Sequence, residues 1–129
     1  IVVDERRLKE MEARGFGLFN YSVLTADTCK GHYEQMRERL VDLEEEIGDA
    51  EDNLREEEED IAIARQELEQ GEQSGNENAL SHLRDRLDNE EDEKNDAEDV
   101  LEDARELYQK HLIIKNEIKK YCLELKVSL

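Results

Sequence analysis

Apolar side chains recur every seven residues over most of the chain, in two interleaved sets whose steps alternate between three and four. In the first stretch, one set reads Ala26, Tyr33, Leu40, Ile47, Leu54, Ile61 and Leu68, and the other reads Ser22, Cys29, Met36, Leu43, Ala50, Glu57, Ala64 and Gly71. A repeat sustained over this length is typical of a coiled coil. It predicts a first helical arm from about residue 22 to about residue 70.

The same repeat resumes after residue 78, but in a different frame. One set reads Leu80, Leu87, Lys94, Leu101, Tyr108, Lys115, Cys122 and Leu129, and the other reads Leu83, Glu90, Ala97, Ala104, His111, Ile118 and Leu125. A single uninterrupted helix would carry its apolar stripe to another face at this point, whereas a chain reversal needs no continuity of frame. The pattern therefore predicts a second arm over about 79–129.

The segment between the arms, 71–78, contains the residues that a reversal needs. Gly71 can end the first helix in a left-handed conformation, Gly75 is a second permissive position, and Asn76 or Asn78 can cap the second helix. We therefore expect an antiparallel hairpin in which residue i lies opposite residue 151 − i. A flexible break in a long parallel coil is the alternative.

Pairing by this rule matches small residues with large ones, as close packing requires. Five predicted layers have this form: Ala64–Leu87, Leu54–Ala97, Ala50–Leu101, Ile47–Ala104 and Ala26–Leu125. The charge in the first seam, Glu57, falls opposite Lys94, and we expect these two to form a pair that fixes the register. The layer Ile61–Glu90 fits the rule poorly.

The rule also places Cys29 and Cys122, the two cysteines of the chain, in one layer. Opposed seam positions bring side chains close enough for a disulfide, so we predict one here. Two buried free thiols are the alternative. A disulfide favours an extracellular or secretory-lumen location, with the cytoplasm as the second choice.

Residues 1–20 differ from the 21–129 hairpin. Asp4 to Arg14 is predicted to be helical, with Asp4 as its N-cap and Gly15 and Gly17 at its end. Beyond it, Phe16, Leu18 and Phe19 form an apolar clasp that we expect to cover the base of the hairpin, the end near the cysteines, or to contact a partner. A loose terminus is the alternative.

The base has more apolar residues than one seam uses. Val100, Leu107, Ile114 and Tyr121 lie seven apart and form a second stripe, and Ile113 lies beside it. A helix that is apolar beyond one stripe usually has more than one neighbour. We expect docking of segment 1–20, dimerisation, or both, through a surface that includes Phe16, Phe19, Leu107, Ile113, Ile114 and Tyr121.

Charge excludes several function classes. Charged residues are 43% of the chain and the net charge is −19, of which residues 41–105 carry −21. Nucleic acid is excluded as a partner because phosphate binding needs clustered Lys and Arg. No apolar run has the length of a membrane span. The acids also lack the spacing of a calcium loop, so we expect no metal site and no cofactor.

The remaining motif is the tripeptide Asn20-Tyr21-Ser22, an N-glycosylation sequence at an expected junction between loop and helix. His32, His82 and His111 are scattered, no Ser/His/Asp set or phosphate loop is present, and we predict no catalytic residues.

Together the patterns predict a non-catalytic structural and interaction module. We expect it to be a rigid, disulfide-linked arm of a larger extracellular or lumenal protein, since the chain begins at Ile1 rather than Met. It would self-associate as a homodimer or larger assembly, or bind a protein partner, through its apolar base. The alternative is an intracellular acidic module whose tip binds basic proteins.

Overall fold

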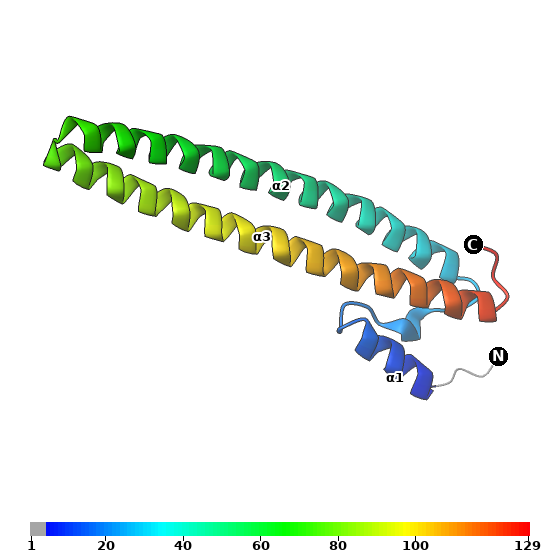
Figure 1. Ribbon diagram of the computed structural model, residues 1–129. Coiled ribbons are helices and arrows are strands. Elements are labelled where there is room, and N and C mark those ends of the chain that lie inside the picture. The colour runs from blue at the N-terminus through cyan, green and yellow to red at the C-terminus, as the bar shows by residue number, and fades with distance from the viewer. Residues whose placement is uncertain (1–4) are drawn as a thin grey trace. The chain divides into compact units, whose positions relative to one another are not determined.

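The computed structural model describes residues 5–129, which form helices joined by short connections (Figure 1). In chain order these are α1 (Glu5–Arg14), the short 3₁₀ helix η1 (Tyr21–Val23), α2 (Cys29–Ser74) and α3 (Glu77–Glu124). Helices α2 and α3 run antiparallel and pack against each other (Figure 1). The predicted all-α hairpin with a short N-terminal helix is confirmed.

The chain divides into two compact units, and α2 and α3 each contribute to both. The disulfide unit contains Ile1–Glu45 and Arg105–Leu129, and the turn unit contains Glu46–Ala104. The disulfide unit holds the largest apolar cluster, and the turn unit holds the chain reversal.

The reversal takes only Gly75 and Asn76. Gly75 has φ of +70°, a conformation that strains any residue with a Cβ, and its N–H donates to the Gly71 carbonyl at 3.2 Å. Asn76 caps α3, because its Oδ1 accepts from the Ala79 N–H at 3.3 Å. The predicted centre of the reversal is confirmed, but the predicted 71–78 loop is mostly helical.

Gly71 has a different role from the predicted one. It lies inside α2 and is buried, and a Cβ at this position would come within 2.6 Å of Leu83 Cδ1 and 3.4 Å of Leu80 Cδ2. Its missing side chain lets α3 approach closely, and the helix ends one turn later. Gly71 and Leu80 obey the rule of 151.

The two seams are buried as the heptad pattern predicts. From Cys29 to Gly71 on α2, and from Leu80 to Leu125, every seam position is buried or half-buried. Apolar residues outside the seams behave differently: Val41, Ile63 and Val100 are 63%, 48% and 57% exposed. The helices therefore share a narrow apolar stripe, which matches a chain with so much charge.

The outer helix ends differ from the predicted ones. Helix α2 begins at Cys29 rather than near residue 22, because Leu24 is extended and the chain enters the helix through Thr25. Consequently Ser22 and Ala26 are exposed and lie outside the seam.

At the other end, α3 stops at Glu124 through a Schellman motif. The Val127 N–H donates to the Cys122 carbonyl at 3.0 Å and the Lys126 N–H donates to the Leu123 carbonyl at 3.0 Å. Lys126 takes the left-handed conformation, φ 61°, in place of the glycine that is usual at this position. Residues 125–129 are therefore not helical, although the heptad pattern continues to Leu129.

Helix α1 ends in the same way. Phe16 is left-handed at φ 55°, the Phe16 N–H donates to the Ala13 carbonyl at 3.1 Å, and the Gly17 N–H donates to the Glu12 carbonyl at 3.3 Å. The predicted Asp4 cap lies outside the described residues. Gly15 and Gly17 do mark the end of this helix, as expected.

The turn gives a pair of glycine substitutions with opposite expected signs. Gly75→Ala forces a Cβ into the left-handed region and should lower the free energy of unfolding by about 1 kcal/mol. Gly48→Ala lies inside α2 with open space around the new methyl group and should raise it by about 0.5–1 kcal/mol. Urea unfolding followed by circular dichroism measures both. Equal effects would contradict the assigned turn.

Candidate functional site

The disulfide unit encloses an apolar cluster to which each helix within residues 5–129 contributes. Two of its sides come from α2 and α3, and the third comes from α1 and η1. Its buried members are Leu8, Met11, Tyr21, Leu24, Cys29, Met36, Ile114, Ile118, Tyr121 and Cys122. Because Leu8, Met11 and Tyr21 are members, the N-terminal segment is part of this core. Burial of each aliphatic or aromatic side chain contributes about 1.5–3 kcal/mol to the free energy of unfolding.

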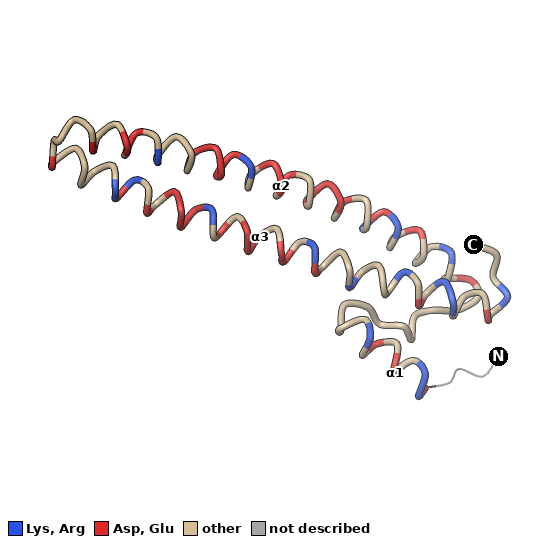
Figure 2. Tube along the Cα trace, viewed as in Figure 1, with Lys and Arg blue, Asp and Glu red and all other residues tan. Residues whose placement is uncertain are grey.

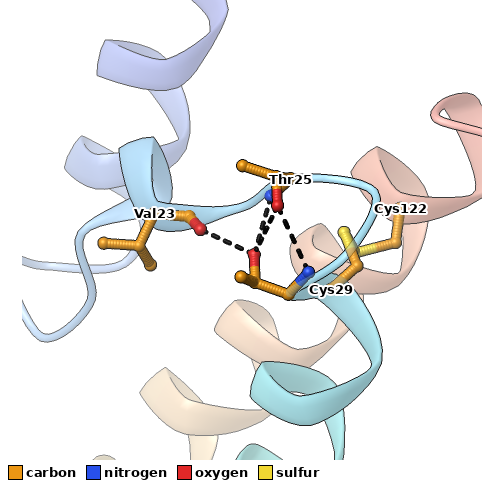
Figure 3. The surroundings of a disulfide bond; sticks show 5 residues. Val23, Thr25, Cys29 and Cys122 are labelled. Atoms are coloured by element: carbon orange, nitrogen blue, oxygen red, sulfur yellow. Dashed lines mark hydrogen bonds between the residues drawn. A yellow bond between two sulfur atoms is a disulfide. The ribbon is translucent and has the colours of Figure 1, made fainter.

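Cys29 and Cys122 form a disulfide in this cluster, and both residues are fully buried (Figure 3). The pairing is the one that the rule of 151 predicts. Because Cys29 is the first residue of α2 and Cys122 lies in the last turn of α3, the bond ties the open ends of the two helices together. It closes a loop with a sequence separation of 93 residues.

A reciprocal capping box holds the start of α2 beside the disulfide (Figure 3). The Thr28 N–H donates to Thr25 Oγ1 at 3.2 Å, and the Thr25 N–H donates to Thr28 Oγ1 at 2.8 Å. The Thr28 hydroxyl also donates to the Val23 carbonyl at 2.8 Å. Thr25 therefore caps the start of α2, whereas Ser22 belongs to η1. These bonds link η1 to the helix that carries Cys29.

Charged contacts hold α1 on α3. Arg14 Nη1 lies 2.7 Å from Glu117 Oε1, and this Glu117 is only 5% exposed. Lys120 Nζ lies 3.8 Å from the same oxygen, so the buried carboxylate has two cationic partners. Arg7 pairs with Glu124, and its guanidinium lies 5.6 Å from the centre of the Tyr121 ring. Helix α1 therefore covers Tyr121 with specific polar contacts as well as apolar ones.

Tyr21 anchors the connection and was not singled out by the sequence pattern. It is 0% exposed, and its hydroxyl is buried with no hydrogen-bond partner among the described residues. Burial, followed by the nearby Glu117 carboxylate, raises the pKa of this hydroxyl well above its ordinary value. Gly15 makes room for it, since a Cβ there would lie 3.0 Å from the Tyr21 oxygen.

Several residues of the predicted partner surface are buried within this unit. Ile114 is 0% and Tyr121 5% exposed, because α1 and η1 lie over them. Phe19 is half-buried against the cluster, with its ring centre 5.0 Å from that of Tyr21 and 5.7 Å from that of His32. Leu107 is half-buried. These residues serve the core, so they are not an open surface.

Phe16 and Ile113 remain accessible. Phe16 is 53% exposed, Ile113 is half-exposed, and both line a shallow groove of about 350 Å³ together with Ala13 and Arg14. Lys110 Nζ lies 5.1 Å from the centre of the Phe16 ring. The left-handed backbone at Phe16 turns the chain away from α1 and leaves this ring in solvent. The groove is apolar at its centre and cationic at its edge.

All of the net charge belongs to the turn unit. Residues 46–104 contain 24 Asp and Glu against five Lys and Arg, a net charge of −19, while the disulfide unit contains 13 of each and is neutral. Figure 2 shows the acidic residues along α2 and α3. Interhelical pairs such as Arg86 with Glu67, and Arg65 with Glu91 at 3.6 Å, balance few of these charges.

Within the turn unit, three carboxylates converge: Glu57 on α2 with Glu90 and Glu93 on α3. One oxygen from each lies within 4.8 Å of the others, and Glu57 Oε2 and Glu90 Oε2 are buried without a hydrogen-bond partner among the described residues. Partial burial, the Glu93 carboxylate and Asp60 raise the pKa of Glu57 and that of Glu90, while Arg86 lowers the pKa of Glu90. Oxygen sets of this kind can share a proton or hold a hard cation.

The predicted Glu57–Lys94 register pair is not among the ion pairs of the described residues. Lys94 Nζ instead lies 3.6 Å from Glu98 on its own helix, and the carboxyl nearest to Glu57 in the seam is that of Glu93. Lys94 is 35% exposed, and an i,i+4 pair lets its ammonium group stay in water. The layer is thus anionic rather than neutral.

No helix among residues 5–129 contains an apolar stretch long enough to cross a membrane. No family model, curated protein or solved structure matches the chain.

The disulfide can be tested by removing one sulfur. Cys29→Ser should lower the free energy of unfolding by about 4 kcal/mol, since the bond restricts a loop of 93 residues in the unfolded chain. Thermal melting with and without reductant measures the loss. The wild type should fall to the level of the variant when it is reduced, and the variant itself should not respond to reductant. A wild type that is insensitive to reductant would contradict a stabilising role.

The acidic layer predicts a specific pH dependence. Because the pKa of Glu57 is raised in the folded state, its protonation favours folding, fully below the unfolded pKa of about 4.3, and this gain is lost as pH rises through the folded pKa. Glu57→Gln should therefore raise the melting temperature at neutral pH and leave it unchanged at about pH 4.

The matched control is Glu58→Gln, which removes the same charge at an exposed position on α2. General relief of charge repulsion would raise the melting temperature of both variants alike. A larger effect at Glu57 isolates the layer, and equal effects would refute the assignment.

Proposed function

We propose that the chain is a non-catalytic structural and interaction module, a disulfide-linked helical arm of a larger extracellular or lumenal protein. The observation that carries the proposal is the accessible groove of Phe16 and Ile113, on a unit that buries Tyr21, Ile114 and Tyr121 in its core. An apolar groove on a disulfide-linked helical unit suits binding better than chemistry. The groove beside Glu117 does gather charged side chains, but Arg14 and Lys120 there pair with Glu117 within the fold.

Contacts within the disulfide unit fix the residues that form the groove. Arg14 at its rim pairs with the buried Glu117, and the adjoining Gly15 packs against Tyr21 and Ile114. Because these contacts hold Arg14 and its neighbour in place, we expect the shape of the groove to be set before a partner binds. Preorganised sites lose less entropy on binding.

Self-association through this groove is the form of the proposal that we favour. A stable interface buries about 800 Å² on each partner, so the groove would be the centre of a larger contact along α1 and α3. An aromatic side chain at the centre of such an interface usually contributes most of the binding energy. Neutrality of the disulfide unit also supports self-association, because two copies of it do not repel each other.

The buried disulfide supports the proposed extracellular or lumenal location of the protein. Such bonds persist in extracellular and lumenal compartments and are rare where thiols are kept reduced. Free thiols in protein isolated from its native source would contradict this part of the proposal.

A second candidate function rests on the turn unit. Its net charge of −19 would attract basic proteins, and this attraction should collapse as salt rises, since exposed charges are screened beyond about 8 Å at physiological ionic strength. Removal of the groove would leave such binding intact, so the two candidates are separable.

Phe16→Asn tests the groove directly. Asn tolerates the left-handed backbone at this position better than most residues, so the change removes the ring without adding strain. Sedimentation at tens of micromolar should show an oligomer for the wild type and a shift of at least about tenfold in its dissociation constant for the variant.

The control is Val41→Ser, which removes an apolar group that is 63% exposed on α2 and does not line the groove. It should assemble as the wild type does. A monomeric wild type, or equal loss in both variants, would contradict self-association through the groove.

A further inference from the structure

The connection between α1 and α2 carries the one Asn-x-Ser/Thr sequence of the chain, Asn20-Tyr21-Ser22. We propose that Asn20 is an N-linked glycosylation site, which receives an oligosaccharide from a lipid-pyrophosphate donor. This inference rests on the lumenal location in the proposed function, and it goes beyond it by assigning a covalent modification to one atom, Asn20 Nδ2.

The backbone of this tripeptide turns its outer residues toward solvent and its middle residue inward. Asn20 and Ser22 are exposed, whereas Tyr21 is 0% exposed and packs in the apolar cluster. Asn20 is also the N-cap of η1, so its position is set by the folded chain. A glycan attached there would extend into solvent from a point that the Tyr21 side chain holds in place.

The hydrogen bonds of Asn20 leave its nitrogen available. Asn20 Oδ1 accepts from the Ser22 N–H at 3.1 Å and from the Ser22 hydroxyl at 2.6 Å. Both bonds use the carbonyl oxygen of the side chain. Glycosylation replaces one hydrogen on Nδ2 and keeps the amide carbonyl, so the modified residue can cap η1 as before. The folded structure therefore accepts the product without rearrangement.

The bond changes balance without an electron donor or acceptor. The Asn20 nitrogen bonds to the anomeric carbon of the sugar, and the bond from that carbon to the pyrophosphate oxygen breaks. The lipid pyrophosphate leaves with the electron pair, and the amide proton passes to a base of the transferase. Ser22 supplies the hydroxyl that the acceptor sequence requires two residues after the asparagine.

The order of synthesis keeps Asn20 accessible when transfer must occur. Cys122 follows Asn20 by 102 residues, an interval of about 5–20 s at 5–20 residues per second. Asn20 therefore enters the lumen on a chain that cannot yet form the disulfide or bury Tyr21 against α3. Glycan transfer and disulfide formation take place in the same compartment, so two separate features of the chain point to one environment.

The experiment measures the intact mass of the full chain before and after digestion with a peptide N-glycosidase. Protein isolated from the cells that make it should lose mass on digestion. Asn20 should then read as aspartate in peptide sequencing, because the enzyme converts a glycosylated asparagine to aspartate. For the variants, the full chain is directed into the secretory pathway of eukaryotic cells by a cleavable leader. Ser22→Ala should abolish the mass loss, and Ser22→Thr should preserve or increase the glycosylated fraction.

Circular dichroism excludes misfolding as the cause, since Ser22 is exposed and Ser22→Ala should retain the wild-type helix content. Wild-type chains with an oxidised Cys29–Cys122 pair and an unmodified Asn20 would overturn the glycosylation proposal and leave the lumenal location standing. Reduced cysteines in natively isolated protein would count against the location itself. The two failures are therefore distinguishable in the same mass spectrum.

Discussion

The antiparallel register of α2 and α3 is the constraint on which the rest of the structure depends. Only when residue i meets residue 151 − i do Cys29 and Cys122 fall in one layer, and only then does Gly71 leave space for the side chains of α3. A slip by one heptad would separate the sulfur atoms and place Leu side chains against the wrong partners. The two-residue turn keeps this register because it leaves no slack between the helices.

The two units stabilise this register by different means. The disulfide unit uses a three-sided apolar core, a covalent bond and ion pairs that include the buried Glu117. In the turn unit the seam is narrow and interrupted by Glu57 and Glu90, and neighbouring acids raise the free energy of the folded state through repulsion. Stabilising interactions are therefore unevenly distributed along the helices.

The sequence predicts the hairpin, its centre and the cysteine pairing, because heptad spacing and the rule of 151 depend only on residue numbers. Prediction from the sequence fails where a single side chain has several possible partners or a single residue several possible backbone conformations. Lys94 pairs within its own helix, which no register argument reveals. Lys126 takes the left-handed conformation that glycine usually takes, so no glycine marks the end of α3 and the heptad pattern continues past it. Burial of Tyr21 cannot be predicted from the sequence pattern, because a lone aromatic residue in a short connection belongs to no periodic repeat.

The position of the disulfide also decides how the chain transmits force. Cys29 lies at the start of α2 and Cys122 in the last turn of α3, so a pull applied before residue 29 and after residue 122 passes directly through the sulfur–sulfur bond. The ninety-two residues between the cysteines then carry no tension, and neither the seam nor the turn can be unzipped from outside. In a protein under mechanical load, this hairpin would be a side branch that keeps its shape while the main chain is stretched.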